Sequence, residues 1–298
     1  PGAGKTTAVA PALLGEPWCT GEILLLSPRR LAARAAAERM AELAGEPVGG
    51  TIGYATRLDT KRSAKTRITV LTEGIFLKRV QTDPELAGVS AVLFDEVHER
   101  SLDSDFGLAL ALDAQAALRP DLRLVAMSAT LDGTRVAGWL STPVLRRAGR
   151  AFPVRIEYPP ARRGENELAQ LRRVVQMALD ETGGDVLVFL PGRREIAQAQ
   201  NALSPSPNER GVTVLQLHGE LPIEQQSRVL QPDPDGHRRV VLATNVAESS
   251  VTLPGVRVVI DSGLAREPRF DPNSGFTRLE TVTISQASAD QRAGRAGR

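Results

Sequence analysis

Residues 92–106 read VLFDEVHERSLDSDF, and this stretch raises the central question about the chain. An apolar run leads directly into two adjacent carboxylates, Asp95 and Glu96. Burial of one ionised acid is costly, and two neighbouring acids repel each other. Either the strand ends at Asp95 and the acids are solvated, or a cation binds there.

Apolar, β-branched runs alternate with Ala-rich helical segments on both sides of this stretch. Strands that are apolar on both faces are typical of parallel sheets covered by helices. The pattern predicts two open parallel α/β domains, at 1–142 and 163–298, joined by a Pro-rich linker at 143–162. The predicted strands are residues 22–27, 67–72, 90–95, 122–128, 185–192, 212–219, 238–245 and 256–263.

The composition fits a soluble protein with two domains. The chain has 298 residues, of which 42% are hydrophobic and 24% charged, and its net charge of +2 indicates no general attraction for nucleic acid. Only four of the 37 basic residues are lysines, which reflects a compositional bias more than a phosphate-binding surface. The single cysteine, Cys19, excludes an intramolecular disulfide and favours a cytoplasmic location. No apolar run approaches the ~20 residues needed to span a bilayer.

The chain opens with PGAGKTT, the end of a P-loop pattern whose leading glycine would lie two positions before Pro1. Gly2, Ala3 and Gly4 would turn backbone N–H groups toward phosphate oxygens at the start of a helix. Lys5 would reach the β- and γ-phosphates, and Thr6 would coordinate Mg²⁺. Thr7, the next residue, is also predicted to contact the nucleotide. The alternative is a glycine-rich turn with an exposed lysine. We also expect that the strand normally preceding this loop is needed for solubility and activity.

A P-loop gives the two acids a function. In such enzymes a strand-terminal Asp holds Mg²⁺ and a neighbouring carboxylate orients the attacking water. Asp95 is therefore predicted to bind the metal, Glu96 to act as general base, and His98 to link the motif to the second domain. The tail QRAGRAGR adds arginines at a spacing of three, which predicts arginine fingers if an anion lies opposite, or otherwise a solvated basic helix.

The ordered motifs together resemble the DEAH-box branch of the superfamily 2 RNA helicases, with wording most similar to the bacterial HrpB type. Those motifs are PGAGKTT, SPRRLAARAAAERMA, TEG, DEVH, SAT, FLPGRREI, ATNVAESSVT and QRAGRAGR. The resemblance implies two RecA-like domains that close on ATP and Mg²⁺ and step along RNA as a monomer. Val97 replaces the alanine of the name-giving motif, a neutral change. These 298 residues do not include the winged-helix, ratchet and OB-like domains typical of the family.

The resemblance also implies roles for individual residues. Ser128 and Thr130 of SAT would couple the nucleotide site to the second domain. Residues implied to contact the nucleic-acid backbone are Arg30, Arg57, Thr72, Arg193 and Thr244. Residues implied to contact the nucleotide phosphates are Ser250, Gln291, Arg295 and Arg298. Each of these residues alone has a simpler structural interpretation, because Ser and Thr at strand ends cap helices or fill turns.

The base of the nucleotide is expected to be held loosely. The family places an arginine on one side of the base, matched by Arg39, and an aromatic on the other, where this sequence has Leu230. Pro254 replaces an acid expected near the ribose. Weaker nucleoside contacts predict that other NTPs are hydrolysed as well as ATP.

Residues 265–285 predict a β-hairpin, because the turn residues DPNSG separate two alternating segments. The resemblance implies that this hairpin wedges between nucleic-acid strands, and the alternative is an ordinary surface hairpin. His218 and His237 have no Cys or His neighbours at ligand spacing, which predicts no metal site there. Two other functions remain open: a nucleic-acid-stimulated clamp or remodelling ATPase without processive unwinding, and a DNA translocase.

Overall fold

The structure is a computed structural model that describes residues 4–128, 138, 140, 142–145, 152–203, 211–248, 251 and 253–296. The chain divides into two compact units, residues 2–149 and residues 150–298, called here domain 1 and domain 2. This division lies inside the predicted linker, and the predicted boundaries at 142 and 163 remain predictions. None of the described helices combines the length and hydropathy that crossing a bilayer requires.

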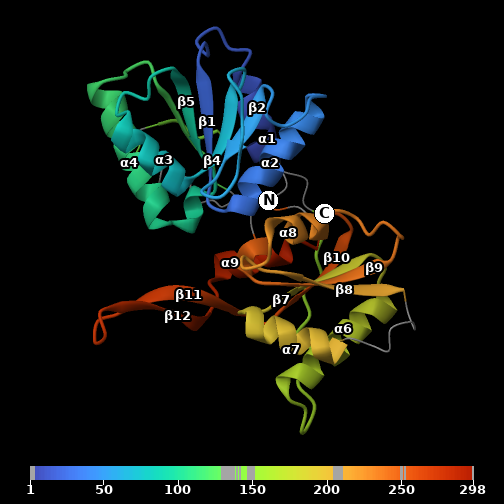
Figure 1. Cartoon of the computed structure of the whole chain (residues 1–298). Coiled ribbons are helices and arrows are strands. Elements are labelled where there is room, and N and C mark those ends of the chain that lie inside the picture. Colours follow the sequence, from blue (N-terminus) through green and yellow to red (C-terminus); the bar gives the residue numbers. More distant parts are fainter. Residues whose placement is uncertain are drawn as a thin grey trace. The chain divides into compact units, whose positions relative to one another are not determined.

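Domain 1 is a six-stranded sheet with helices on both faces (Figure 1). Its strand order is β3-β2-β4-β1-β5-β6, and all neighbours are parallel except the short β3. Its elements are α1 (Lys5–Leu13), β1 (Glu22–Ser27), α2 (Arg30–Leu43), β2 (Ile52–Ala55), β3 (Thr60–Lys61), β4 (Ile68–Thr72), α3 (Glu73–Thr82), β5 (Val89–Phe94), η1 (Val97–Glu99), α4 (Leu102–Ala117) and β6 (Arg123–Ala126).

The apolar residues of the central strand β1 alternate between two cores. Ile23 and Leu25 pack in one cluster with the buried alanines and Met40 of α2. Leu24 and Leu26 face the other cluster, which contains Phe76 of α3. Because successive strand residues point to opposite faces, a strand covered on both sides must be apolar throughout. This explains why an uninterrupted EILLLS run forms a central parallel strand.

Domain 2 contains a four-stranded parallel sheet in the order β10-β7-β9-β8. Two further strands, β11 and β12, form an antiparallel pair in which Leu264 lies opposite Thr283 and Asp271 opposite Phe276. Figure 1 shows this hairpin extending away from the four-stranded sheet. The elements are α6 (Glu167–Glu181), β7 (Asp185–Phe189), α7 (Arg193–Leu203), β8 (Val212–Leu217), α8 (Ile223–Val229), β9 (Arg238–Ala243), η2 (Asn245–Ala247), β10 (Val256–Asp261), β11 (Leu264–Asp271), β12 (Phe276–Thr283) and α9 (Gln286–Ala293).

The predicted fold class of two tandem α/β domains with parallel sheets is confirmed. All eight predicted strands are present, each ending within a few residues of its expected position. The sequence analysis did not identify β2 or β3, which are four and two residues long. Gly53 in β2 is a poor strand former in sequence, but a Cβ at this position would lie 2.5 Å from the carbonyl oxygen of Lys61. Close pairing with β3 therefore requires glycine here.

Candidate functional site

The predicted site residues of domain 1 follow its parallel strands at one edge of the sheet. In the order of the strands, Arg57 follows β2, Thr72 ends β4 and Arg30 follows β1. Asp95 then follows β5, and Ser128 follows β6. The carboxyl ends of parallel strands are where ligands bind in open α/β sheets. The fold thus gathers at one edge residues that are up to 98 positions apart in sequence.

The start of α1 contacts this edge through side chains of the P-loop pattern. Gly4 precedes the helix with φ of 68°, a left-handed conformation that glycine adopts without strain. The hydroxyl Oγ1 of Thr6 donates to Oδ2 of Asp95 at 2.6 Å. The ammonium Nζ of Lys5 donates to the backbone oxygen of Ser128. The three motifs that supply these residues therefore meet directly within domain 1.

Asp95 is a buried carboxyl, with 4% of its surface exposed. Burial raises the pKa of Asp95 to about 6, and the neighbouring Glu96 adds to the rise; the hydrogen bond from Thr6 acts in the opposite direction. Burial makes ionisation of this carboxyl group costly, and a bound cation would offset that cost by stabilising the carboxylate. Carboxylate and hydroxyl oxygens 2.6 Å apart are suitable ligands for a hard divalent cation, so these residues fit Mg²⁺.

The backbone holds Glu96 in a defined orientation beside Asp95. Glu96 has φ of 53°, which is uncommon for a residue with a side chain. Its N–H donates to Oδ1 of Asp95 at 3.0 Å, and its Oε2 lies 3.5 Å from Nδ1 of His98. The next residue, Val97, donates to the backbone oxygen of Met127 at 3.1 Å. Strained residues cluster at functional sites, and this one places a second, mostly buried carboxylate next to Asp95.

The remaining nucleotide-site predictions have different outcomes. Thr7 donates through Oγ1 to the backbone oxygen of Gly4 at 3.3 Å. Arg39 is exposed, and its Nη1 lies 2.6 Å from Oε2 of Glu42. Both residues belong to α2, so this ion pair does not test the predicted contact of Arg39 with the nucleotide base. That contact remains a prediction. The predicted residues Gly2, Ala3, Thr130, Ser250 and Arg298 lie outside the described residues.

The three nucleic-acid contacts predicted in domain 1 lie at the other half of the same edge. Arg30 and Arg57 are exposed, and Thr72 is half-buried at the start of α3 without a side-chain capping bond. The turn that carries Arg57 is closed by Thr56, whose N–H donates to the backbone oxygen of Asp59 at 2.8 Å. Asp59 in turn accepts a hydrogen bond from the hydroxyl of Tyr54 at 2.5 Å. This support for the Arg57 turn was not predicted from the sequence.

Domain 2 places Arg193 and Thr244 at the carboxyl ends of the adjacent strands β7 and β9. Arg193 begins α7, and its Nη1 lies 2.9 Å from Oε2 of Glu220, with both side chains exposed. Thr244 is half-buried and precedes η2. As in domain 1, the predicted nucleic-acid contacts of domain 2 follow the carboxyl ends of parallel strands.

The described arginines of the QRAGRAGR tail are held inside domain 2. Arg292 is 1% exposed and forms ion pairs with Glu248 and Asp261, both at 2.8 Å. Arg295 donates through Nε to the backbone oxygen of Glu248 at 2.9 Å and through Nη1 to that of Val251. Gln291 is also buried. For Arg292 the anion opposite is therefore supplied by the protein itself.

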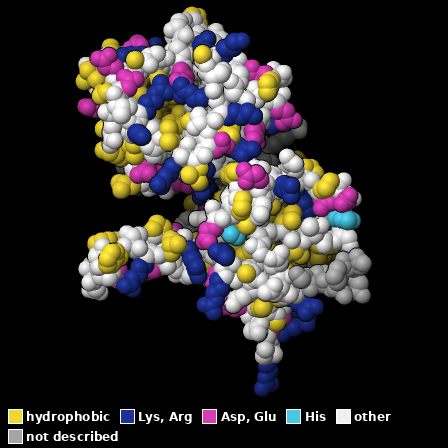
Figure 2. All heavy atoms as spheres, in the orientation of Figure 1, with side chains coloured by type: hydrophobic (Ala, Val, Ile, Leu, Met, Phe, Trp, Pro, Cys, Tyr) yellow, Lys and Arg dark blue, Asp and Glu magenta, His cyan; other side chains and the backbone are white. Residues whose placement is uncertain are grey.

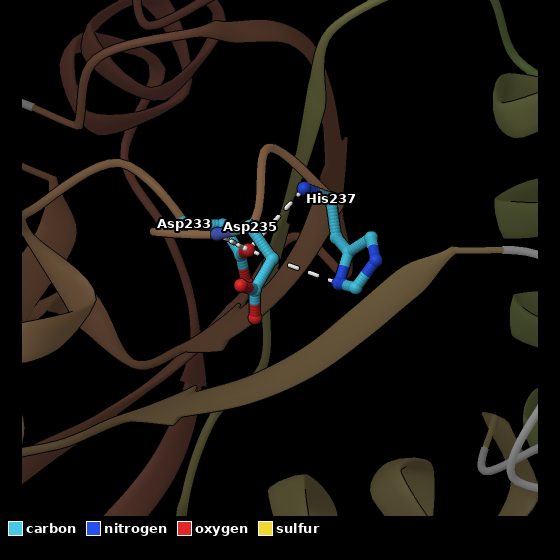
Figure 3. A group of neighbouring side chains, drawn as sticks. All are labelled: Asp233, Asp235 and His237. Carbon is cyan, nitrogen blue, oxygen red and sulfur yellow. Dashed lines mark hydrogen bonds and ion pairs between the residues drawn. The ribbon is translucent and has the colours of Figure 1, made fainter.

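Asp233, Asp235 and His237 form a cluster that the sequence analysis missed, because it considered only Cys and His as neighbours (Figure 3). One potential ligand atom from each lies within 4.8 Å of the others. Oδ1 of Asp233 accepts from the N–H groups of Asp235 and His237 at 3.0 and 3.2 Å. Burial raises the pKa of Asp233, but these donors outweigh it and lower the pKa below its ordinary value. These hydrogen bonds close the turn before β9, which explains why the three side chains lie close together.

Comparisons with known proteins match both domains. Residues 1–137 match the DEAD/DEAH box helicase family, and residues 167–298 match the helicase conserved C-terminal domain. The chain is 46% identical to the ATP-dependent RNA helicase HrpB of Escherichia coli, over all of this chain and 37% of that protein. It is 38% identical to the pre-mRNA-splicing factor ATP-dependent RNA helicase prp22 of Schizosaccharomyces pombe, over all of this chain and 26% of that protein.

Solved structures give the same result. The crystal structure of the Escherichia coli DEAH/RHA helicase HrpB aligns with a TM-score of 0.90 and 46% identity, covering 99% of this chain and 38% of that one. A second crystal structure, of the E. coli DExH-box NTPase HrpB, aligns with a TM-score of 0.82 over 99% of this chain. The chain therefore spans just over a third of the length of HrpB.

Proposed function

Because the chain belongs to the DEAD/DEAH box helicases, a family of ATP-hydrolysing enzymes, we propose that it is the motor core of an ATP-dependent RNA helicase. The observation that supports this proposal best is the contact of three separate motifs at the edge of domain 1. Lys5 and Thr6 of the P-loop pattern reach Ser128 and Asp95, with Glu96 adjacent.

Each of these side chains has a distinct role in phosphate-bond hydrolysis. Lys5 binds the β- and γ-phosphates, exchanging its present bond to Ser128 for phosphate oxygens. Thr6 and Asp95 would hold Mg²⁺, which would supply positive charge to neutralise the phosphate oxygens. Glu96 orients the attacking water and accepts its proton. The predicted phosphate contacts of Gln291, Arg295 and Arg298, and the γ-phosphate contact of Ser250, remain predictions.

The RNA strand is proposed to lie along the part of the edge formed by β2, β4 and β1. Arg30 and Arg57 are exposed there, and Thr72 offers a hydroxyl. Arg193 and Thr244 supply the corresponding contacts in domain 2. Contacts of this kind bind the phosphate backbone, so affinity should fall steeply with salt and depend little on sequence. The same contacts do not distinguish RNA from DNA, since only 2′-OH contacts would.

The hairpin β11–β12 has the exposed apolar surface that a strand-separating wedge requires. Phe270, Phe276 and Leu279 are 65%, 71% and 67% exposed. Figure 2 shows hydrophobic and basic side chains side by side on the hairpin. Arg269 lies directly opposite Arg278 across its strands, and Nη2 of Arg278 lies 3.8 Å from Oδ2 of Asp271, so the hairpin carries basic side chains beside its exposed apolar ones. Unwinding of a duplex is therefore favoured over clamping alone.

The proposal is tested with the full-length natural protein on matched RNA and DNA duplexes carrying a 3′ overhang. ATP hydrolysis and strand displacement are measured together. We expect RNA-stimulated hydrolysis and unwinding by a cytoplasmic, monomeric enzyme. Shortening residues 268–277 to a tight turn should remove unwinding and leave RNA-stimulated hydrolysis largely intact.

Three other outcomes would change the proposal. Stimulated hydrolysis without strand displacement would identify a clamp or remodelling ATPase. Preference for the DNA duplex would identify a DNA translocase. A parallel loss of hydrolysis and unwinding in the shortened variant would make the hairpin a structural support.

A further inference from the structure

The hairpin β11–β12 is attached to helix α9 at both of its ends. One attachment is covalent, because β12 ends at Thr283 and α9 begins at Gln286. The other is made by Arg292 of α9, which reaches back to the junction of β10 and β11. Its Nη1 donates to Oδ1 of Asp261 at 2.8 Å and to the backbone oxygen of Leu264 at 3.2 Å. The segment from Asp261 through the hairpin to Arg292 is therefore closed by a contact between its two ends.

The surroundings of Arg292 make this second attachment stiff. The side chain is 1% exposed, and its guanidinium lies 4.7 Å from the ring centroid of Phe189 in β7. Nε donates to Oε2 of Glu248 at 2.8 Å. A guanidinium is planar, and donors fixed on two of its edges leave little freedom to rotate. A displacement of α9 is thus transferred to Asp261 rather than absorbed by the side chain.

The same cluster contains the segments predicted to respond to the nucleotide. Glu248, which pairs with Arg292, also accepts bonds through its backbone oxygen from Nε and Nη2 of Arg295, at 2.9 and 2.6 Å. Gln291 and Arg295 are predicted phosphate contacts, and Ser250 follows Glu248 by two positions. One network of hydrogen bonds therefore joins Arg295, a predicted phosphate contact, to the root of the hairpin through Glu248 and Arg292.

We propose that Arg292 and Asp261 are a coupling pair that transmits nucleotide-dependent movement of α9 to the hairpin. The inference rests on the proposed function and deepens it. Arg292 is buried in contacts with the protein and Asp261 pairs with it, so we assign both as positioning residues. A second contact at the hairpin, between Nη2 of Arg266 and Oε1 of Glu195 in α7, is longer at 3.3 Å. Its side chains are 37% and 31% exposed, and ion pairs in water are weak, so we assign it no coupling role.

The main experiment compares duplexes opened per ATP hydrolysed in the full-length protein. Asp261→Ala should retain RNA-stimulated hydrolysis to within about twofold, as expected for a change outside the ATPase residues. In the same variant, the number of duplexes opened per ATP hydrolysed should fall by about fivefold or more, a typical size for coupling between sites. Asp261→Asn keeps an acceptor oxygen for Arg292 and should restore most of that ratio. Glu195→Ala, which breaks the exposed contact, should leave the ratio unchanged.

Amide hydrogen exchange without nucleotide provides a second test that does not depend on helicase activity. Asp261→Ala should speed exchange in α9 and in the first residues of β11 together, because they share one attachment. Faster exchange confined to residues 261–264 would overturn the coupling pair. So would an unchanged ratio of unwinding to hydrolysis in Asp261→Ala, or a fall in that ratio in Glu195→Ala instead. A wild-type protein that opens no duplex would contradict the proposed function, while the exchange result would still decide this inference.

Discussion

Asp95 in domain 1 and Arg239 in domain 2 are both buried charged residues, but their surroundings differ. Asp95 lies beside a second acid, Glu96, and burial raises its pKa to about 6. Arg239 is 2% exposed and donates to Oδ2 of Asp185 through Nε and Nη2, at 2.8 and 2.5 Å. Its remaining hydrogen bonds go to the backbone oxygens of Val229, Gln231 and Pro254.

The difference separates a charge that is compensated inside the fold from one that is compensated only in part. The guanidinium of Arg239 is neutralised and its donors are satisfied inside domain 2, which is how a buried charge avoids destabilising a core. Asp95 has hydrogen bonds from Thr6 and Glu96, but their effect is smaller than that of burial and the second acid. Incompletely compensated groups of this kind mark functional sites.

The largest expected effects concern turnover in domain 1. Glu96→Gln should keep ATP affinity and lose about 10²–10⁴-fold in hydrolysis, because a general base is removed while the phosphate contacts remain. Lys5→Ala should abolish nucleotide binding. ATP affinity and steady-state hydrolysis measure both changes, with Lys78→Ala, an exposed lysine of α3, as the control that stays active. Full ATP turnover by Glu96→Gln would end the assignment of the base.

The second prediction concerns stability in domain 2. Arg239→Leu leaves Asp185 buried without its partner and should lower the free energy of unfolding by about 3–5 kcal/mol. The matched control is Arg193→Ala, whose ion pair with Glu220 has side chains 69% and 68% exposed. That change should cost less than about 1 kcal/mol. Urea unfolding followed by circular dichroism distinguishes them, and equal losses would remove the contrast between buried and exposed arginines.

The third prediction uses the raised pKa of Asp95 in protein free of Mg²⁺. An unfolded aspartate ionises near its ordinary value of 3.8, whereas the folded group ionises near about 6. Between these values the native state holds a proton that the unfolded state has lost, so this group reduces stability as pH rises from about 4 to about 6, by up to about 3 kcal/mol. Asp95→Asn should remove that decrease, as measured by urea unfolding across the pH range. Identical pH profiles for variant and wild type would contradict the prediction.

The smallest expected effect concerns the choice of nucleotide. Arg39 is exposed and paired with Glu42, Leu230 has no aromatic ring, and Pro254 replaces an acid. These features offer little to discriminate bases, whereas the phosphate contacts of Lys5 and Thr6 are common to all NTPs. We predict that GTP, CTP and UTP have kcat/KM within about tenfold of ATP, a gap of about 1.4 kcal/mol. Competition kinetics in saturating RNA would measure it, and a strong preference for ATP would reveal a base-specific contact.

The fold of domain 1, and the sheet edge where its predicted site residues meet, were predictable because their signals are local. An uninterrupted apolar run indicates a strand covered on both faces, and the alternation with helices indicates parallel order. P-loop and acidic motifs each occupy a few consecutive residues, so PGAGKTT and DEVH were identifiable before their contact was known. Asp95 and Thr6 then meet because parallel strands end at the same edge.

The sequence by itself determined the parallel α/β architecture and identified Lys5, Thr6, Asp95 and Glu96 as the candidate site residues of domain 1. The tertiary structure alone decided the burial and the partners of Arg292 and Arg295. Arg292 and Arg295 share one motif and a helical spacing, yet Arg292 pairs with carboxylates from 31 and 44 positions away, and Arg295 binds backbone oxygens. A local pattern records that a side chain is charged, but its burial and its partners depend on residues that only folding brings within contact distance.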